Sequence, residues 1–308
     1  MKIAIIGAGA MGCLYGGYLS KKNEVIMLDS YEPQVKAINE RGITIVEPDG
    51  SERVCKNVRA YLSGQFEEAV DLVIVFVKST FTEEAVTANA HLFGKDTLVM
   101  TLQNGAGNDR KIEKYVKPEN VIVGTSKHNA VNMGDGKTKH GGSGATTIGS
   151  NHRAVKTVEL IADVLRQSGF MVVVSDDIQR IIWSKLFVNL SINTFTALIE
   201  TPIGYMLKNH YAWDFAKRLV YEAVEVAEAD GTYFDRREAL EMVRQVCIDA
   251  GDGYSSMYQD RKRRVKMEID AINGAIVEQA KLYGVPTPYN SLIVDLIHAV
   301  EGAYDLYD

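Results

Sequence analysis

The sequence has few of the residues that stabilise small secreted proteins or bind metals. Its 308 residues include only 3 cysteines and 6 prolines. The cysteines, at positions 13, 55 and 247, have no paired spacing, which argues against a disulfide framework or a zinc site. The 6 histidines form no H-E-x-x-H or similar pair. We therefore expect no metal and a location in the reducing cytoplasm.

The sequence also lacks long apolar runs and an excess of positive charge. We find no run of the ~18 to 20 apolar residues that a membrane span needs. Residues 3–6 are apolar, but glycines follow at once, which indicates a buried strand rather than a signal peptide. The net charge of -6 disfavours binding to a phosphate backbone, and the basic run at 262–264 is typical of a solvated helix face. We expect neither a nucleic-acid nor a membrane partner.

The first half of the chain alternates short apolar runs with helical patterns. The hairpin turn Pro48-Asp49-Gly50 joins predicted strands at 43–46 and 52–54, and a glycine-rich hairpin is expected near 134–149. Repeated strand–helix–strand units predict an α/β fold built on a Rossmann-type doubly wound parallel sheet. A helix is predicted over 11–21, and further strands over 2–6, 24–28, 71–77, 97–101 and 121–124.

The second half contains helical patterns alone, which predicts an all-α domain. The change falls near residue 176, so we predict a dinucleotide-binding domain over 1–176 and a helical substrate and dimerisation domain over 177–308. Long apolar helices of this kind would permit a homodimer. The predicted helices cover 178–199, 213–230, 236–250, 261–283 and a last segment from 289.

A glycine motif joins the first predicted strand to the first predicted helix. Residues 7–12 read Gly7-Ala8-Gly9-Ala10-Met11-Gly12, which matches G-x-G-x-x-G. The first glycine permits a tight turn, the second lets a pyrophosphate approach the backbone, and the third lets helix and strand pack closely. The helix N-terminus then offers unpaired N–H groups to the phosphates. We predict that Gly7, Gly9, Ala10, Met11 and Gly12 bind a dinucleotide.

An acidic residue ends the second predicted strand, 20 residues after Gly9. Asp29 is placed to hydrogen-bond a ribose 2′-hydroxyl, and its carboxylate would repel a 2′-phosphate. No Arg or Lys follows it directly, since the next residues are Ser30, Tyr31 and Glu32. We therefore predict NAD as the preferred cofactor, with NADP as the alternative.

A polar stripe marks the otherwise apolar helix predicted over 178–199. Lys185, Asn189 and Asn193 fall at i, i+4 and i+8 and share one face. A lone lysine would be a surface residue in most helices, but buried amides without partners are costly. The stripe is therefore expected to line a cleft. An ordinary lysine amine titrates near pH ~10.4, so it can donate a proton at neutral pH.

Five further candidates are weaker when each is taken alone. Glu268 lies in a charged helical pattern, and Ser255 and Ser256 could be ordinary helix caps. Asn104 and Lys78 follow predicted strands, where ligands of such sheets bind.

Taken together and in order, these segments resemble the ketopantoate reductase (2-dehydropantoate 2-reductase) family over nearly the whole chain. The shared segments are the glycine motif, Val77-Lys78, Gln103-Asn104-Gly105-Ala106-Gly107, Trp183-Ser184-Lys185-Leu186-Phe187-Val188-Asn189 with Asn193, Ser255-Ser256-Met257-Tyr258-Gln259-Asp260, and Glu268-Ile269-Asp270-Ala271-Ile272-Asn273-Gly274. The last two segments are specific, whereas the glycine motif is not.

The resemblance implies a role for each candidate in the reduction of a small 2-oxo acid for pantothenate and coenzyme A synthesis. Lys185 would be the general acid, and Glu268 would hold the substrate through its hydroxyl. Asn189 and Asn193 would bind the substrate, and Ser256 its carboxylate. Asn104 and Lys78 would contact the cofactor near the reacting centre, and Asn104 also the substrate. The site would lie in a cleft between the two domains.

Two departures from the family pattern keep a rival open. The stretch after the second strand is acidic, and Met267 stands where a threonine is common in the family. These features favour an NAD-linked branch of D-2-hydroxyacid dehydrogenases that act on other branched or aromatic 2-oxo acids. A non-catalytic NAD(H) sensor is a more remote alternative, disfavoured by the presence of Lys185 and Glu268.

Overall fold

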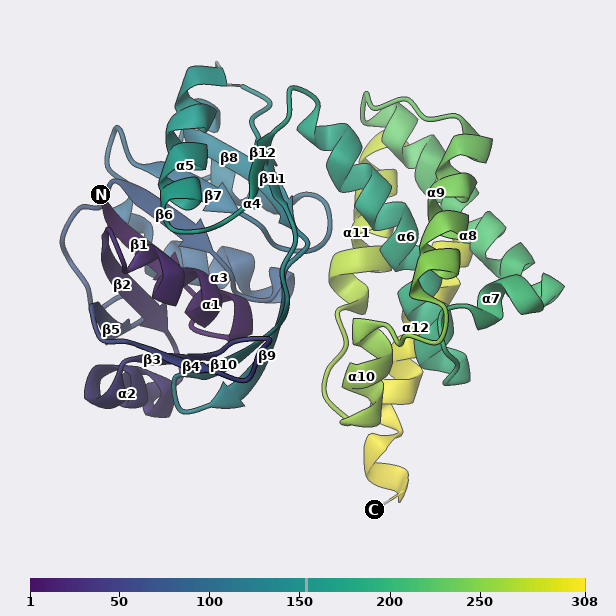
Figure 1. Ribbon diagram of the computed structural model, residues 1–308. Helices are drawn as coiled ribbons and strands as arrows, with labels where there is room; N and C mark the ends of the chain where they lie inside the picture. The colour runs from purple at the N-terminus through teal and green to yellow at the C-terminus, as the bar shows by residue number, and fades with distance from the viewer. Residues whose placement is uncertain (153–154, 308) are drawn as a thin grey trace. The chain divides into compact units, whose positions relative to one another are not determined.

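The computed structural model describes residues 1–152 and 155–307, and the chain divides into two compact units (Figure 1). The first unit contains Met1–Gln103 and Asn108–Ile178. The second contains Gln179–Asp308 together with the short segment Asn104–Gly107. In sequence, this segment lies between the two parts of the first unit. The first unit is α/β and the second is helical, which confirms the predicted fold class. The boundary after residue 176 between a dinucleotide-binding domain and a helical substrate and dimerisation domain stays a prediction.

An eight-stranded sheet forms the centre of the first unit. Its strand order is β12-β11-β8-β7-β6-β1-β2-β5, and neighbours from β8 to β5 are parallel, whereas β11 is antiparallel to β8. The strands are β1 (Lys2–Ile6), β2 (Glu24–Asp29), β5 (Val58–Leu62), β6 (Leu72–Val75), β7 (Leu98–Thr101), β8 (Val121–Ser126), β11 (Thr146–Gly149) and β12 (Val172–Val174). The helices of this unit are α1 (Ala10–Leu19), α2 (Glu32–Arg41), α3 (Thr82–Ala88), α4 (Asn108–Glu113) and α5 (Val155–Gln167).

The strand order places a topological switch point at β1. The chain runs from β1 to β2 and β5 on one side and from β6 to β7 and β8 on the other, so β1 pairs with both β2 and β6. Open α/β sheets bind ligands beyond the carboxyl ends of the strands at such a point. The glycine motif follows β1 directly and therefore lies at this position.

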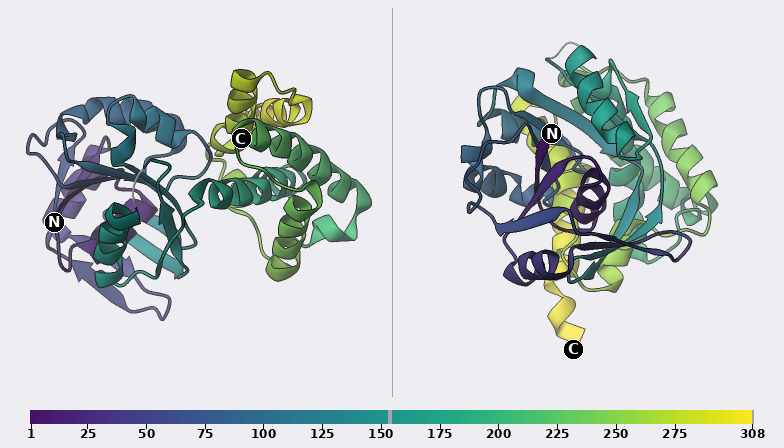
Figure 2. Two further views of the ribbon diagram at one scale, coloured as in Figure 1. Left: turned by 90° about the horizontal axis from the view of Figure 1, so that it is seen from above. Right: turned by 60° about the vertical axis from the view of Figure 1, so that its left-hand side comes forward.

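A smaller sheet packs against α1, and the sequence predicted only part of it. The hairpin of β3 (Ile43–Val46) and β4 (Glu52–Cys55) is confirmed as antiparallel. Its parallel pairing with β10 (Lys137–Gly142), which in turn pairs with β9 (Asn129–Gly134), was not expected. The segments that form this sheet are far apart in sequence and lie side by side (Figure 2). We call these four strands the small sheet.

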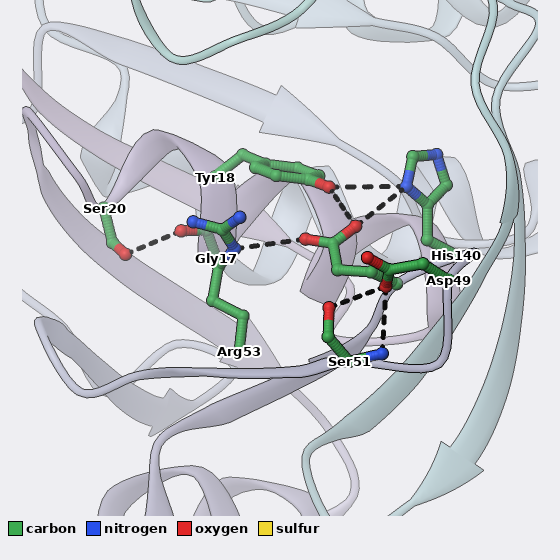
Figure 3. Close-up of polar contacts among 8 residues, drawn as sticks. Gly17, Tyr18, Ser20, Asp49, Ser51, Arg53 and His140 are labelled. Atoms are coloured by element: carbon green, nitrogen blue, oxygen red, sulfur yellow. Dashed lines mark hydrogen bonds and ion pairs between the residues drawn. The ribbon is translucent and has the colours of Figure 1, made fainter.

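A half-buried carboxylate joins the small sheet to α1. Glu47 accepts hydrogen bonds from Tyr18 Oη at 2.7 Å and from Arg53 Nε at 3.1 Å, and its Oε2 lies 3.5 Å from His140 Nδ1 (Figure 3). Burial acts to raise the pKa of Glu47, but the bonds from Tyr18, Arg53 and His140 outweigh it and hold this pKa below its ordinary value. Glu47 is therefore ionised at neutral pH, and its charge holds α1 and the small sheet together.

The second unit is built around one long apolar helix, α6 (Ile178–Ile199). Trp183, Phe187 and Leu190 of this helix are fully buried in the core of the unit. Within the part of the chain that the structure describes, α6 is the one helix long and apolar enough to cross a membrane, which the sequence analysis did not expect. Its apolar window is 61% buried inside the protein, as in the core helix of a soluble protein. The other helices are α7 (Tyr205–Lys208), α8 (His210–Ala229), α9 (Arg236–Ala250), α10 (Ser256–Lys262), α11 (Ile269–Tyr283) and α12 (Pro288–Gly302).

The prediction of one helix over 261–283 is wrong. The chain leaves helical geometry after Lys262 and re-enters it at Ile269, and Arg264 adopts a positive φ of 54°. The N–H of Met267 donates to Glu301 Oε1 of α12 at 2.6 Å. This bond stabilises the non-helical conformation of the segment before Ile269. The break places Glu268 at the start of α11 rather than in the middle of a helix.

Candidate active site

The glycine turn, residues 7–12, has the geometry that a dinucleotide requires. Gly7 adopts a φ of +103°, and a Cβ there would lie 2.7 Å from the backbone N of Val77. A Cβ on Gly12 would lie 1.8 Å from the carbonyl oxygen of Gly7, so only glycine allows α1 to pack this closely. A Cβ on Gly9, in contrast, would meet nothing within 4 Å and would fill the space that a ligand needs. The residues present therefore fit a dinucleotide.

The first turn of α1 offers hydrogen-bond donors at this point. Gly9 is the N-cap residue and no side chain caps the helix, and the N–H of Cys13 bonds to Gly9 O at 2.9 Å. Helices leave their first N–H groups without intrahelical partners, and these groups bind anions well. Gly9, Ala10 and Met11 are partly accessible, whereas Gly7 and Gly12 are buried.

Asp29 lies at the end of β2 and is bonded to the glycine turn. Its Oδ2 accepts the N–H of Ala8 at 2.6 Å, and its Oδ1 accepts the N–H of Tyr31 at 2.9 Å. Each carboxylate oxygen keeps a second lone pair for a ribose hydroxyl. The side chain of Asp29 thus stabilises the glycine turn. The sequence analysis expected it only to hydrogen-bond a ribose hydroxyl.

Lys78 is exposed and lies three residues after β6, which ends at Val75 rather than at residue 77 as predicted. It is the N-cap residue of a short 3₁₀ helix, Ser79–Phe81, and its carbonyl oxygen accepts the N–H of Phe81 at 2.8 Å. The sheet neighbour β1 carries the glycine turn at the same edge, so Lys78 shares an edge of the sheet with the predicted cofactor residues.

The polar stripe of α6, Lys185 with Asn189 and Asn193, lies in the second unit. Lys185 and Asn189 are half-buried, and Asn193 is only 8% exposed. Among the residues that the structure describes, no hydrogen-bond partner is present for the side-chain amide of Asn189 or of Asn193. Amides in such positions are available to a polar ligand.

Glu268 and Asn104, which are 164 residues apart in sequence, are brought together. Asn104 Nδ2 donates to Glu268 Oε2 at 3.2 Å. Glu268 is the N-cap residue of α11, but its side chain does not cap the helix. The segment Asn104–Gly107 lies on α11, and a Cβ on Gly105 would lie 1.9 Å from the carbonyl oxygen of Ala271. Only glycine at 105 permits this approach, which gives Asn104 its position beside Glu268.

The two serines before α10 differ in their surroundings. Ser255 is buried and is the N-cap residue: its Oγ accepts the N–H of Tyr258 at 3.1 Å and lies 2.7 Å from Thr196 Oγ1 of α6. Ser256, the predicted carboxylate ligand, is exposed at the first position of the helix. Its predicted role is not contradicted, since an exposed hydroxyl at a helix N-terminus can bind an anion.

A histidine that bonds to Asp270, two residues after Glu268, was not found from the sequence. His298 of α12 lies between two carboxylates, with Nε2 2.8 Å from Asp270 Oδ1 and Nδ1 2.9 Å from Glu301 Oε2. Burial acts to lower the pKa of His298, but its bonds to Glu301 and Asp270 outweigh burial and raise it above its ordinary value. The i, i+3 spacing of His298 and Glu301 was visible in the sequence, whereas Asp270 is 28 residues away.

The residues that the structure describes contain no group of three His, Cys, Asp or Glu side chains that could hold a metal ion. The three cysteines are free and buried, and burial raises the pKa of Cys13 to about 12, so this thiol is unreactive at neutral pH.

Two family models match the chain, one in each half. Residues 3–153 match Ketopantoate reductase PanE/ApbA, and residues 177–301 match Ketopantoate reductase PanE/ApbA C terminal. The chain is 35% identical over 302 residues to a 2-dehydropantoate 2-reductase of Pyrococcus abyssi, covering 98% of each chain. It is 30% identical over 309 residues to that of Streptococcus pyogenes serotype M1, covering 99% of this chain and 100% of the relative.

A solved structure is also similar to the whole chain. The ternary structure of D-mandelate dehydrogenase with NADH and anilino(oxo)acetate is 34% identical, covers 99% of this chain and 100% of that chain, and has a TM-score of 0.90.

Proposed function

The chain belongs to the ketopantoate reductase family, and from this premise we propose that it reduces the C2 keto group of 2-dehydropantoate to the hydroxyl of D-pantoate. As a member of this family it is an NAD(P)-dependent reductase.

The observation that carries the proposal is the polar stripe of α6. One lysine lies in line with two amides on the core helix of a unit that the family model matches. A 2-oxo acid presents a carboxylate and a carbonyl oxygen, and these need donors that are already in position. The half-buried Lys185 and Asn189 and the buried Asn193 supply such donors.

The glycine turn and Asp29 are the residues that would hold the cofactor. The N–H groups at the start of α1 would bind its pyrophosphate, Asp29 would accept the ribose hydroxyls, and Lys78 would lie near the reacting centre. When bound, the nicotinamide supplies the hydride.

Lys185 completes the reaction by proton transfer. Its ammonium donates a proton to the oxygen on C2, so that the new O–H bond forms as an Nζ–H bond breaks and a neutral amine remains, which solvent reprotonates. Asn189 and Asn193 orient the keto acid, and Ser256 donates to its carboxylate. Glu268, oriented by Asn104, accepts the substrate hydroxyl.

We propose NAD as the preferred form of the cofactor. A 2′-phosphate would stand against the carboxylate of Asp29, which is held in place by two backbone N–H groups and cannot swing aside without losing them. The next residues, Ser30, Tyr31 and Glu32, include no cation to offset that repulsion.

Steady-state oxidation of NADH and of NADPH with three 2-oxo acids tests the proposal. We expect kcat/KM to be highest with NADH and ketopantoate, and lower with 2-oxoisocaproate and phenylglyoxylate, which lack the hydroxyl that Glu268 would hold. A marked preference for either acid without a hydroxyl would overturn the ketopantoate assignment while leaving the reaction type intact.

That outcome would support a second candidate, an NAD-dependent D-2-hydroxyacid dehydrogenase. The similarity to D-mandelate dehydrogenase over 99% of the chain favours it. Met267, which precedes Glu268 in the sequence, is buried. Because methionine stands where a threonine is common in the family, the threonine hydroxyl is missing at this position.

We also propose that the helical unit pairs two copies of the chain. Tyr289, Leu292 and Leu296 fall at i, i+3 and i+7 on α12 and are exposed, which gives an apolar stripe that a second copy could cover. Sedimentation of the wild type should give a dimer, and Leu292→Glu with Leu296→Glu should give a monomer. A monomeric wild type would contradict this part.

A further inference from the structure

Side chains outside the glycine motif hold the carbonyl groups of the glycine turn. Gln34 Nε2 of α2 donates to Ala8 O at 2.7 Å, and Thr138 Oγ1 of β10 donates to Ala10 O at 3.1 Å. Gln34 is 5% exposed and Thr138 is fully buried. Neither residue is among the candidate site residues of the sequence analysis.

Both side chains also connect the glycine turn to the small sheet. The Oε1 atom of Gln34 accepts the N–H of Gly136, in the turn between β9 and β10, at 3.0 Å. Thr138 lies on β10 itself, two residues further on. The small sheet, which carries no predicted site residue, thus bonds to the turn at two points.

The planarity of the peptide bond gives these contacts a consequence for ligand binding. In a trans peptide the carbonyl of one residue and the N–H of the next lie in one plane and point in opposite directions. A hydrogen bond that fixes Ala8 O therefore fixes the direction of the N–H of Gly9. In the same way, the bond from Thr138 to Ala10 O fixes the N–H of Met11. Both N–H groups belong to the turn that would bind the pyrophosphate.

We propose that Gln34 and Thr138 are positioning residues for the cofactor: they orient the N–H groups of Gly9 and Met11 toward a pyrophosphate, and they make the small sheet part of the dinucleotide site. The inference rests on the nicotinamide cofactor of the proposed function, but not on the identity of the substrate. Neither residue is expected to touch the ligand.

The test compares substitutions that remove a donor with matched controls. Gln34→Met and Thr138→Val keep the volume of each side chain and remove its hydrogen bonds. Asn39→Leu is the control for Gln34→Met, because Asn39 also lies on α2 and bonds both peptide groups of Ala60, at 2.8 Å each, away from the glycine turn. Thr138→Ser is the control for Thr138→Val, because it retains the hydroxyl.

The dissociation constants for NADH and for ADP-ribose are measured by titration, and stability is measured by urea unfolding of each variant. ADP-ribose carries the pyrophosphate without the nicotinamide, so both constants should rise together. We expect a rise of roughly tenfold for Gln34→Met and several-fold for Thr138→Val, the size expected when alignment worth about one hydrogen bond is lost. Asn39→Leu and Thr138→Ser should bind like the wild type.

Two outcomes would overturn the inference. In the first, Gln34→Met and Thr138→Val bind both ligands within twofold of the wild type. In the second, Asn39→Leu weakens binding as much as Gln34→Met at equal loss of stability, which would reduce the role of Gln34 to general support of α2. If Gln34→Met does not fold, the pair Thr138→Val and Thr138→Ser decides in the same way. A wild type that binds neither ligand would instead contradict the cofactor assignment itself.

Discussion

The glycine turn of the first unit would present backbone groups to the proposed cofactor, whereas the polar stripe of the second unit would present side chains to the proposed substrate. In the turn, glycines keep the space open and the supporting side chains, Asp29 and Gln34, bond to the backbone behind it. In the second unit, the side chains of Lys185, Asn189 and Asn193 are the proposed donors, and Asn104 donates a hydrogen bond to Glu268. A substitution in the first region should therefore change affinity for the cofactor, and one in the second should change turnover or substrate affinity.

The largest expected effect is that of Lys185→Ala. Removing the proposed proton donor should lower kcat by about 10²-fold or more. The dissociation constant for NADH should stay unchanged, because the glycine turn belongs to the other unit. Lys217→Ala is the control, since Lys217 is on α8 and pairs with Asp214. Unchanged turnover in Lys185→Ala would refute the catalytic assignment.

The next effect tests how the loop Asn104–Gly107 positions Glu268. An alanine at 105 would drive its Cβ into the carbonyl oxygen of Ala271 and displace Asn104 from Glu268. We expect kcat/KM for the 2-oxo acid to fall about tenfold or more, because a hydrogen bond to a charged group is lost.

Gly231→Ala is a matched control for that variant. Gly231 has the same φ of +90° as Gly105, but a Cβ there would meet nothing within 4 Å. Both variants therefore bear the same backbone strain, and only Gly105→Ala bears the clash. Equal activities in the two variants would show that the close approach to α11 is irrelevant to the reaction.

Asp29→Ala tests the cofactor preference of the first unit. It removes the proposed ribose acceptor and the bond to Ala8, so NADH should bind several-fold more weakly, while NADPH, relieved of repulsion, should lose less. The ratio of the two dissociation constants should move toward one. Asp71→Ala serves as control, because Asp71 also accepts a backbone N–H, that of Lys2 at 2.8 Å, in another part of the sheet. A ratio that stays as in the wild type would contradict the role of Asp29 in NAD preference.

The smallest expected effect concerns His298, and its pH dependence has a defined sign. A histidine whose folded-state pKa is raised stabilises the protein fully below its unfolded value, near ~6.5, and loses that contribution as the pH rises through the folded pKa. The charges around it are Asp270 and Glu301, which bond to it, and Lys266, whose Nζ lies 3.8 Å from Asp270.

Urea unfolding of the wild type and of His298→Gln should therefore differ more at pH 5.5 than at pH 8.5. The difference should stay below about 1 kcal/mol, because the side chain of His298 is 39% exposed and solvent screens the pairs. In an Asp270→Asn background the effect of pH should shrink. A larger difference at pH 8.5 would contradict the assigned protonation.

Local pattern predicted α6 and α9 to the residue, because their apolar spacing and flanking residues are strong signals. It failed over 261–283, where neither glycine nor proline marks the break before Ile269. The break depends on a bond from Met267 to Glu301, 34 residues away, which no local signal reveals. The helix over Glu32–Arg41 was not predicted either, although it carries Gln34.

By itself, the sequence determined the class of fold, the glycine turn and the stripe of α6, since each depends on residues within one turn or one helix. The tertiary structure alone decided the strand order that puts the glycine turn at a switch point, the bonds of Gln34 and Thr138 behind it, and the meeting of Asn104 with Glu268. Spacing along a helix or in a tight turn is fixed by backbone geometry, whereas contacts between distant segments depend on how whole elements pack.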